Sequence, residues 1–334
     1  MRRTTFLLTA GLATLSMGCD ETNQDQGGSG GSPSGEGGGA TTAVTAGAGG
    51  STGTGFGQSS GSGGGNQEGC TKVDFLFVID NSVSMNDEQV ALVASFPGFM
   101  DTIQNTVAAS SDYHILVADT DAWGRCDTAN GWMGETPEHQ TCNAYIESTT
   151  FEECDRVRGA GVVHPAGEYA SNMPCKVYGG GRYIIEGDPD AAATFACMAK
   201  VGTAGHPSER PMEAIVGALS PELEGPGGCN DGFLRSDAIL VITFISDDPN
   251  DEDTGTPQSW YDAVVAAKGG NTNAVVVLGL TPYSGGAAGL RWHDFIGLWD
   301  AKGLEASVEL DDYTPFFAEA VGLIEDACDE FVPE

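Results

Sequence analysis

Four continuous apolar runs dominate the hydrophobic pattern of the chain: Val73–Ile79, Ile115–Ala118, Ile239–Ile245 and Ala274–Leu280. Runs without alternating polar positions are typical of parallel strands that are covered on both faces. Two further segments, Arg182–Glu186 and a stretch near Ser307–Leu310, are predicted as edge or late strands of the same sheet.

Segments with helical periodicity lie between these runs. They are Asp87–Ala108, Asp190–Val201, Ser208–Leu219, Gln258–Lys268, Leu290–Lys302 and Thr314–Cys328. Strands that alternate with helices imply right-handed crossovers. The predicted fold class is therefore α/β, with a three-layer, doubly wound and mostly parallel sheet in residues 70–334.

A block at about 121–181 interrupts this rhythm. It holds four cysteines, few long apolar runs and many Gly, Pro and polar residues. Because a structureless connection of that length is unusual in a compact domain, we interpret it as a disulfide-braced insertion on the surface of the sheet domain. Its role is either local packing or the shaping of a binding face.

Residues 1–18 have the pattern of a secretory signal peptide, with Arg2 and Arg3 followed by an apolar stretch too short to span a membrane. The segment that ends at Cys19, Ser-Met-Gly-Cys, resembles the lipobox of bacterial lipoproteins, in which the Cys becomes the lipidated first residue. The resemblance implies that Cys19 anchors the mature chain. A simple cleaved signal is the alternative, because the usual Leu stands one position too early, at Leu15.

The segment 19–69 would join this anchor to the sheet domain. Between Gly27 and Gly69, 19 of 43 residues are Gly, so the segment buries too little apolar surface to offset its ordering entropy. We therefore expect a flexible tether with a reach of roughly 40 Å. The predicted location is the cell envelope, at the outer membrane or cell surface in preference to the periplasmic face of the inner membrane.

Charge narrows the choice of partners. The formal net charge is −34, with 14 basic and 48 acidic residues. Such a balance argues against electrostatic binding of nucleic acid or of an anionic membrane surface. Membrane contact is predicted only through the lipid anchor.

The cysteines other than Cys19 are even in number, which in an exported chain favours disulfides over free thiols. They are Cys70, Cys126, Cys142, Cys154, Cys175, Cys197, Cys229 and Cys328. Cys70 directly precedes the first strand and Cys328 lies near the end of the last helix, so a Cys70–Cys328 bond would tie the two ends of the domain together. Zinc is the competing interpretation, but no C-x-x-C or H-x-x-x-H spacing occurs.

The first apolar run leads directly into the motif Asp80-x-Ser82-x-Ser84. An oxygen-rich loop at the carboxyl end of a buried parallel strand can hold a hard divalent cation, and open α/β sheets place ligands at such strand ends. The alternative is that Ser82 and Ser84 cap the helix that begins near Asp87.

Two later positions complete a known pattern. Thr203 lies in the loop Val-Gly-Thr-Ala-Gly, and Asp247 follows the apolar run Ile239–Ile245. With these elements in order, the segment from Cys70 to Phe331 resembles a von Willebrand factor type A (vWA) domain. In that family, a D-x-S-x-S loop, a later Thr and an Asp after the fourth strand form the metal-ion-dependent adhesion site (MIDAS).

The resemblance implies a metal site made of Asp80, Ser82, Ser84, Thr203 and Asp247. These side chains offer only hard oxygen atoms, which suit Mg²⁺, Mn²⁺ or Ca²⁺ and disfavour zinc. Asp248 and His206 are the further side chains expected to support the site or a secondary metal.

By the same resemblance, we expect a non-catalytic module that uses the cation to bind a carboxylate of a protein or peptide partner, in protein–protein interaction or adhesion. A metal-dependent hydrolase and a metal-free structural protein of the envelope are the alternatives. No Ser-His-Asp or Cys-His arrangement can be argued from the spacing, which leaves the hydrolase without an evident general base.

Overall fold

A six-stranded sheet of order β3-β2-β1-β4-β5-β6 organises the computed structural model, which describes residues 70–106, 112–120, 152–205, 209–248, 253–282 and 287–332. Neighbouring strands are parallel except for β2 and β3, which are antiparallel. The strands are β1 (Lys72–Ile79), β2 (Asp112–Asp119), β3 (Ile184–Ile185), β4 (Ile239–Ile245), β5 (Val275–Thr281) and β6 (Gly303–Ser307).

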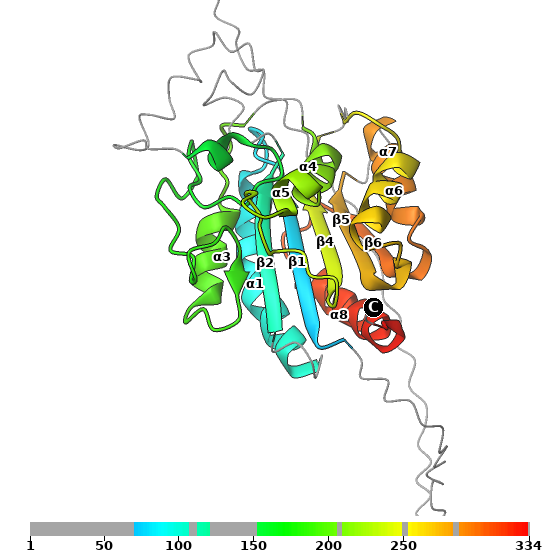
Figure 1. The fold of residues 1–334 in the computed structure, drawn as a ribbon. Coiled ribbons are helices and arrows are strands. Elements are labelled where there is room, and N and C mark those ends of the chain that lie inside the picture. Colours follow the sequence, from blue (N-terminus) through cyan, green and yellow to red (C-terminus); the bar gives the residue numbers. More distant parts are fainter. Residues whose placement is uncertain are drawn as a thin grey trace, which may run out of the picture. The chain divides into compact units, whose positions relative to one another are not determined.

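Helices cover both faces of this sheet (Figure 1). The α-helices are α1 (Asn86–Thr106), α3 (Ala191–Ala199), α4 (Pro211–Ala218), α5 (Pro221–Glu224), α6 (Pro257–Ala267), α7 (Ala287–Gly297) and α8 (Thr314–Glu330). Short 3-10 turns are η3 (Glu153–Arg156), η4 (Thr272–Ala274) and η5 (Asp300–Lys302). The predicted three-layer, mostly parallel α/β class is confirmed.

The central strand β1 explains why the apolar runs are continuous. Phe75 and Phe77 pack into one core cluster with residues of α1, α3 and α8, and Leu76 and Val78 pack into a second cluster with residues of α4, α6 and α7. Successive side chains of a strand point to opposite faces, so a strand between two helical layers needs apolar residues at every position. Burial of each such side chain is worth about 1.5–3 kcal/mol.

The carboxyl-terminal strand differs from the prediction. The chain leaves α7 at Gly297, turns through η5, and pairs Gly303–Ser307 with β5 instead of Ser307–Leu310. All five residues of β6 are only half-buried. An edge strand of this composition carries no continuous apolar run, so its start could not be located from the sequence. The predicted helix Leu290–Lys302 was therefore too long and included the turn η5 that precedes β6.

Capping and proline residues set the starts of several helices. Asp190 accepts a hydrogen bond from the backbone N–H of Ala193 at the start of α3. Thr256 and Ser259 form a reciprocal capping box at the start of α6. Pro occupies the first turn of α4, so this helix begins at Pro211 and not at the predicted Ser208.

Three disulfides brace the described residues: Cys70–Cys328, Cys154–Cys229 and Cys175–Cys197. The first is the predicted bond between the two ends of the domain. The other two connect the block at about 121–181 to segments outside it. Cys19, Cys126 and Cys142 lie outside the described residues, as do the predicted signal peptide, the tether and residues 121–151 of the insertion.

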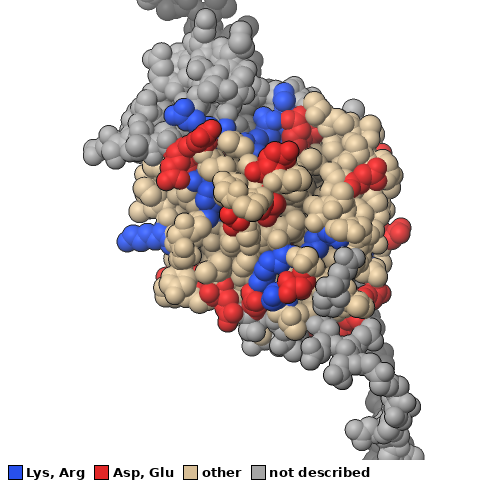
Figure 2. All heavy atoms as spheres, in the orientation of Figure 1, with Lys and Arg blue, Asp and Glu red and all other residues tan. Residues whose placement is uncertain are grey.

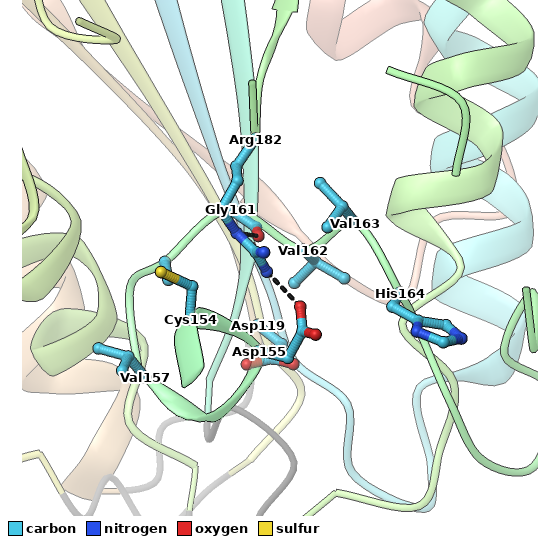
Figure 3. Close-up of a pocket in the computed structure, with 10 residues that line it drawn as sticks. Asp119, Cys154, Asp155, Val157, Gly161, Val162, Val163, His164 and Arg182 are labelled. Carbon is cyan, nitrogen blue, oxygen red and sulfur yellow. Dashed lines mark hydrogen bonds and ion pairs between the residues drawn. The ribbon is translucent and has the colours of Figure 1, made fainter. Parts of the chain in front are cut away.

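The described part of the insertion packs against the carboxyl half of β2. The Arg182 guanidinium donates hydrogen bonds to the carbonyl oxygen of Gly161 and to the buried Asp155 carboxylate (Figure 3). The Val162 backbone N–H donates to the carbonyl oxygen of Val117 at 2.7 Å. The cavity beside the Arg182–Asp155 pair has a volume of about 10 Å³, room for a single water molecule at most.

Acidic and basic side chains lie next to one another on the face shown in Figure 2. Within the described ranges, no helix is long and apolar enough to cross a membrane.

Arg235 joins the amino-terminal ends of β1 and β2. Its Nε donates to Asp74 Oδ1 at 2.8 Å, its backbone N–H donates to Asp74 Oδ2 at 2.7 Å, and its guanidinium also binds the Asp112 carboxylate. Burial raises the pKa of Asp74 to about 6, although the charge and hydrogen bonds of Arg235 oppose this shift. Arg235 therefore provides most of the interactions that offset the cost of burying the Asp74 carboxylate.

We expect the substitution Arg235→Met to lower the free energy of unfolding by about 3–5 kcal/mol near pH 8, because it leaves the Asp74 carboxylate buried without its ion-pair partner. The loss should shrink at pH 5, where Asp74 takes up a proton. Urea unfolding at the two pH values measures both effects, and the double variant Asp74→Asn/Arg235→Met should recover part of the loss. Equal losses at both pH values would contradict this assignment.

Candidate metal centre

Asp80 follows β1 at the carboxyl edge of the sheet and has no exposed surface. Its backbone N–H donates to the carbonyl oxygen of Ile245 at 2.9 Å, which extends the β1–β4 pairing by one residue. Its Oδ1 accepts from the backbone N–H of Ser82 at 2.6 Å, and its Oδ2 accepts from the Ser246 hydroxyl at 2.7 Å. The end of β4 thus fixes the orientation of the Asp80 carboxylate.

The electrostatic environment of Asp80 disfavours its charge. Burial raises the pKa of Asp80 to about 7, against the opposing effect of hydrogen bonds from Ser246, Ser82 and Glu209, and the negative charge of Asp247 raises it further. Among the described residues, no Lys or Arg is one of the main influences on the pKa of Asp80. A buried carboxylate without a cationic neighbour is costly to ionise, and a bound cation would remove that cost.

The two serine hydroxyls of the motif lie next to each other, with their Oγ atoms 3.5 Å apart. Ser82 is half-buried and Ser84 is exposed. The turn into α1 is closed by backbone hydrogen bonds, such as that from the Asn86 N–H to the Ser84 carbonyl oxygen at 3.0 Å. Neither hydroxyl caps α1 within the described structure, so both oxygen atoms are available at the surface beside Asp80.

Gln89 on α1 connects the Asp80 loop to the Thr203 loop. Its Nε2 donates to the carbonyl oxygens of Asp80 at 3.0 Å and Gly202 at 2.9 Å, and its Oε1 accepts from the Gly202 backbone N–H at 3.0 Å. The Gly205 N–H also donates to the Asn81 carbonyl oxygen at 2.8 Å. The backbone of Gly202 has a φ of +85°, a conformation that glycine adopts readily.

Thr203 is held from its other side by the insertion. Its backbone N–H donates to the carbonyl oxygen of Glu168 at 2.8 Å, and its Oγ1 lies 3.5 Å from the same oxygen. Thr203 is almost fully buried. The insertion therefore positions the loop that carries the predicted Thr ligand.

Asp247 follows β4 and carries a buried oxygen without a hydrogen bond. Its Oδ1 accepts no hydrogen bond from any described residue, and the same holds for Oε2 of Glu88 on α1. The backbone N–H of Asp248 donates to the Ser246 hydroxyl at 3.3 Å, so this residue helps to hold the loop. His206 lies outside the described residues.

Glu209 and Thr120 are two residues near Asp80 that were not predicted from the sequence. Glu209 is fully buried, accepts a hydrogen bond from the Thr120 hydroxyl, and hydrogen-bonds to Asp80. Thr120 follows β2 and also donates to Asn81 Oδ1 at 3.1 Å. The sequence placed Glu209 inside a helix predicted to begin at Ser208, whereas Glu209 lies in the loop before α4, which begins at Pro211.

These observations fit a hard divalent cation. Asp80 and Asp247 provide carboxylate oxygens, one of them a buried acceptor without a partner, and Ser82, Ser84 and Thr203 provide hydroxyls from loops that adjoin Asp80. In the described ranges, no group of three or more His, Cys, Asp or Glu side chains is arranged to hold a metal. The hydroxyl oxygens would therefore have to complete the coordination shell.

No protein-family model matches the chain, and no curated protein matches it. Among solved structures, it is similar to proximal thread matrix protein 1 from the mussel byssus, with 10% sequence identity and a TM-score of 0.41. The match covers 77% of this chain and 49% of that one, so the chain spans about half the length of that structure.

The Gln89 bridge predicts a large effect of a small substitution. Gln89→Leu removes three hydrogen bonds and leaves buried backbone groups of Gly202 and Asp80 without partners, so we expect a loss of about 2–4 kcal/mol in the free energy of unfolding. Urea unfolding of the variant measures this loss. Gln258→Leu, at an exposed glutamine of α6, is the matched control and should change stability by less than about 0.5 kcal/mol. Similar losses in both variants would contradict the bridging role.

The raised pKa of Asp80 predicts a pH-dependent stability when a chelator is present. Between pH 3.8 and about 7, the folded chain retains a proton on Asp80 that the unfolded chain has released. The free energy of unfolding should therefore fall as the pH rises through this range, by at most about 4 kcal/mol from this residue. Asp80→Asn, which cannot ionise, should lack this part of the fall. Parallel pH profiles of the two proteins, measured by urea unfolding, would contradict the prediction.

Proposed function

We propose that this protein is a cell-envelope lipoprotein whose vWA-like domain binds a divalent cation, Mg²⁺ or its alternatives Mn²⁺ and Ca²⁺, and through it a carboxylate of a protein or peptide partner. The observation that carries the proposal is the convergence of three loops on Asp80, whose carboxylate is buried. Gln89 joins the Thr203 loop to the backbone carbonyl oxygen of Asp80, and the Ser246 hydroxyl joins the Ser246–Asp247 loop to the Asp80 carboxylate.

Each part of the site has a separate task in this proposal. Asp80 and Asp247 would neutralise the cation, and the hydroxyls of Ser82, Ser84 and Thr203 would complete its shell without adding negative charge. When bound, the cation supplies a positive charge and a coordination position for an oxygen of the partner's carboxylate. Gln89, Ser246 and Glu168 would hold the loops in place, so that little ordering is needed when the partner binds.

The proposed setting is a tethered domain. Lipidation at Cys19 and the glycine-rich segment that follows would allow the domain to extend from the membrane, with the outer membrane or cell surface as the expected location. The proposal assigns no catalytic role to any residue, because binding through the cation accounts for the arrangement of side chains around Asp80.

A thermal-shift experiment on the full chain tests the metal site. Mg²⁺ at about 100 times its dissociation constant should stabilise the fold by about 2.7 kcal/mol, which raises Tm by several degrees. Asp80→Asn should abolish the shift, whereas Asp326→Asn, at an exposed carboxylate of α8, should retain it. An equal Mg²⁺-dependent shift in Asp80→Asn would refute the assignment, and no shift with Mg²⁺, Mn²⁺ or Ca²⁺ in the unmodified chain would favour a metal-free structural role.

A further inference from the structure

A groove lies beside the candidate metal centre, between the first turns of α1 and the loop from β6 to α8. It has a volume of about 450 Å³, which is within the range of ligand-binding pockets. The residues that line it are Asp87, Glu88, Val90, Ala91, Ala94, Val308, Glu309, Leu310 and Asp311. Carboxylates and aliphatic groups are the only side chains among these residues.

The groove is near the candidate metal centre, because Asp87 and Glu88 in its wall follow Ser84 by three and four residues. Burial raises the pKa of Glu88, and the negative charges of Asp247, Asp87 and Glu309 raise it further. Asp247 belongs to the proposed metal site, whereas Asp87 and Glu309 line the groove, so Glu88 is within electrostatic reach of both. A ligand that reached the metal could therefore extend into the groove.

The walls of the groove are held in place by Tyr313. Its backbone N–H donates to the Ser95 hydroxyl of α1 at 3.2 Å, and its phenolic O–H donates to the carbonyl oxygen of Val308 at 2.7 Å. The Val308 N–H in turn donates to the carbonyl oxygen of Thr281 at the end of β5. The loop that carries Glu309, Leu310 and Asp311 is thus fixed to both α1 and the sheet.

Two chemical features coexist in this groove. Val90 and Leu310 are 57% and 43% exposed, and the neighbouring Ala94 is also exposed, so the groove has an apolar surface. Asp87, Glu309 and Asp311 are exposed carboxylates beside this surface. Among the described residues that line the groove, none is Lys or Arg, in contrast with the mixed charges of the face in Figure 2.

We propose that this groove binds a Lys or Arg side chain of the partner, close to the carboxylate that the partner presents to the metal centre. Long basic side chains combine an apolar stem with a charged head group. The stem would cover Val90 and Leu310, while the head group would lie among the carboxylates of Asp87, Glu309 and Asp311. The inference rests on the proposed function and specifies its partner as a segment that carries both an acidic and a basic residue.

A peptide selection on the full chain tests this inference. The probe is a display library of random peptides with one fixed aspartate, captured in Mg²⁺ and eluted with chelator. We expect Lys and Arg to be enriched several-fold over the input near the fixed aspartate, with aliphatic residues beside them. The double variant Glu309→Gln/Asp311→Asn should reduce the enrichment to the level of the input, and high salt should weaken it because these charges are exposed.

The double variant Asp326→Asn/Asp329→Asn is the matched control, because it removes the same number of exposed carboxylates from α8, outside the groove. It should retain the enrichment. A selected peptide and its version with Gln in place of the basic residue should differ in Kd by roughly tenfold on the unmodified chain, equivalent to about 1.4 kcal/mol. The two peptides should bind the Glu309→Gln/Asp311→Asn variant with similar affinity.

The outcomes separate this inference from the proposed function. If chelator elutes peptides without an excess of Lys or Arg, the proposed binding of a basic side chain in the groove is refuted, while metal-dependent binding of the carboxylate is retained. The groove would also be excluded as the binding site of the basic side chain if Lys and Arg stayed enriched on the Glu309→Gln/Asp311→Asn variant. The same conclusion would follow if basic peptides bound equally well without Mg²⁺. A selection without any chelator-eluted peptide would overturn the proposed function and the inference together.

Discussion

The burial of the Asp80 carboxylate is the constraint on which the rest of this site depends. The parallel pairing of β1 with β4 carries Asp80 to a position without solvent exposure, where its pKa rises to about 7. An acidic residue at this position does not stabilise the sheet, because burial makes the ionised carboxylate unfavourable in the folded state. Perturbed carboxylates of this kind are common at functional sites, and here three loops are built around one.

The sequence predicted the elements whose signal is local. Continuous apolar runs identified β1 and β4, and the D-x-S-x-S motif identified the loop after β1, because each depends on a few adjacent residues. Edge strand β6 was misplaced because it is half-buried and carries no apolar run. Gln89 could not be recognised, because a glutamine in a helix has the same pattern whether it faces solvent or, as here, joins two loops.

Glu209 illustrates a second limit of sequence reasoning. Its contact with Thr120 joins residues that are 89 positions apart, and it lies in the loop before α4, which begins at Pro211. The helical pattern, which was predicted to begin three residues earlier at Ser208, gave no sign that this carboxylate is buried. The geometry of a site built from loop residues is therefore less predictable than the order of the strands that carry those loops.

The insertion supports the candidate site from the side opposite to the sheet-borne loops, through its contact with Thr203. Cys154–Cys229 and Cys175–Cys197 fix it at two points outside itself, so its backbone can serve as a rigid support. Between these bonds, the Glu168 carbonyl oxygen receives the Thr203 N–H. A threonine hydroxyl is a weak ligand that contributes only when its loop is already in place, which gives a physical reason for bracing the insertion with disulfides.

The acidity of the chain and the proposed capture of a carboxylate are compatible because they act over different distances. A net charge of −34 repels an acidic partner at long range, but screening limits that repulsion to about 8–10 Å at physiological ionic strength. Within that distance, the local charges decide. A cation at Asp80 would attract the partner's carboxylate, and the acidic groove beside it would attract a basic side chain. A partner segment with both charges would meet attraction at each contact, whereas a purely acidic segment would meet repulsion from Asp87, Glu309 and Asp311, so the groove would act as the element that discriminates among carboxylate-bearing partners.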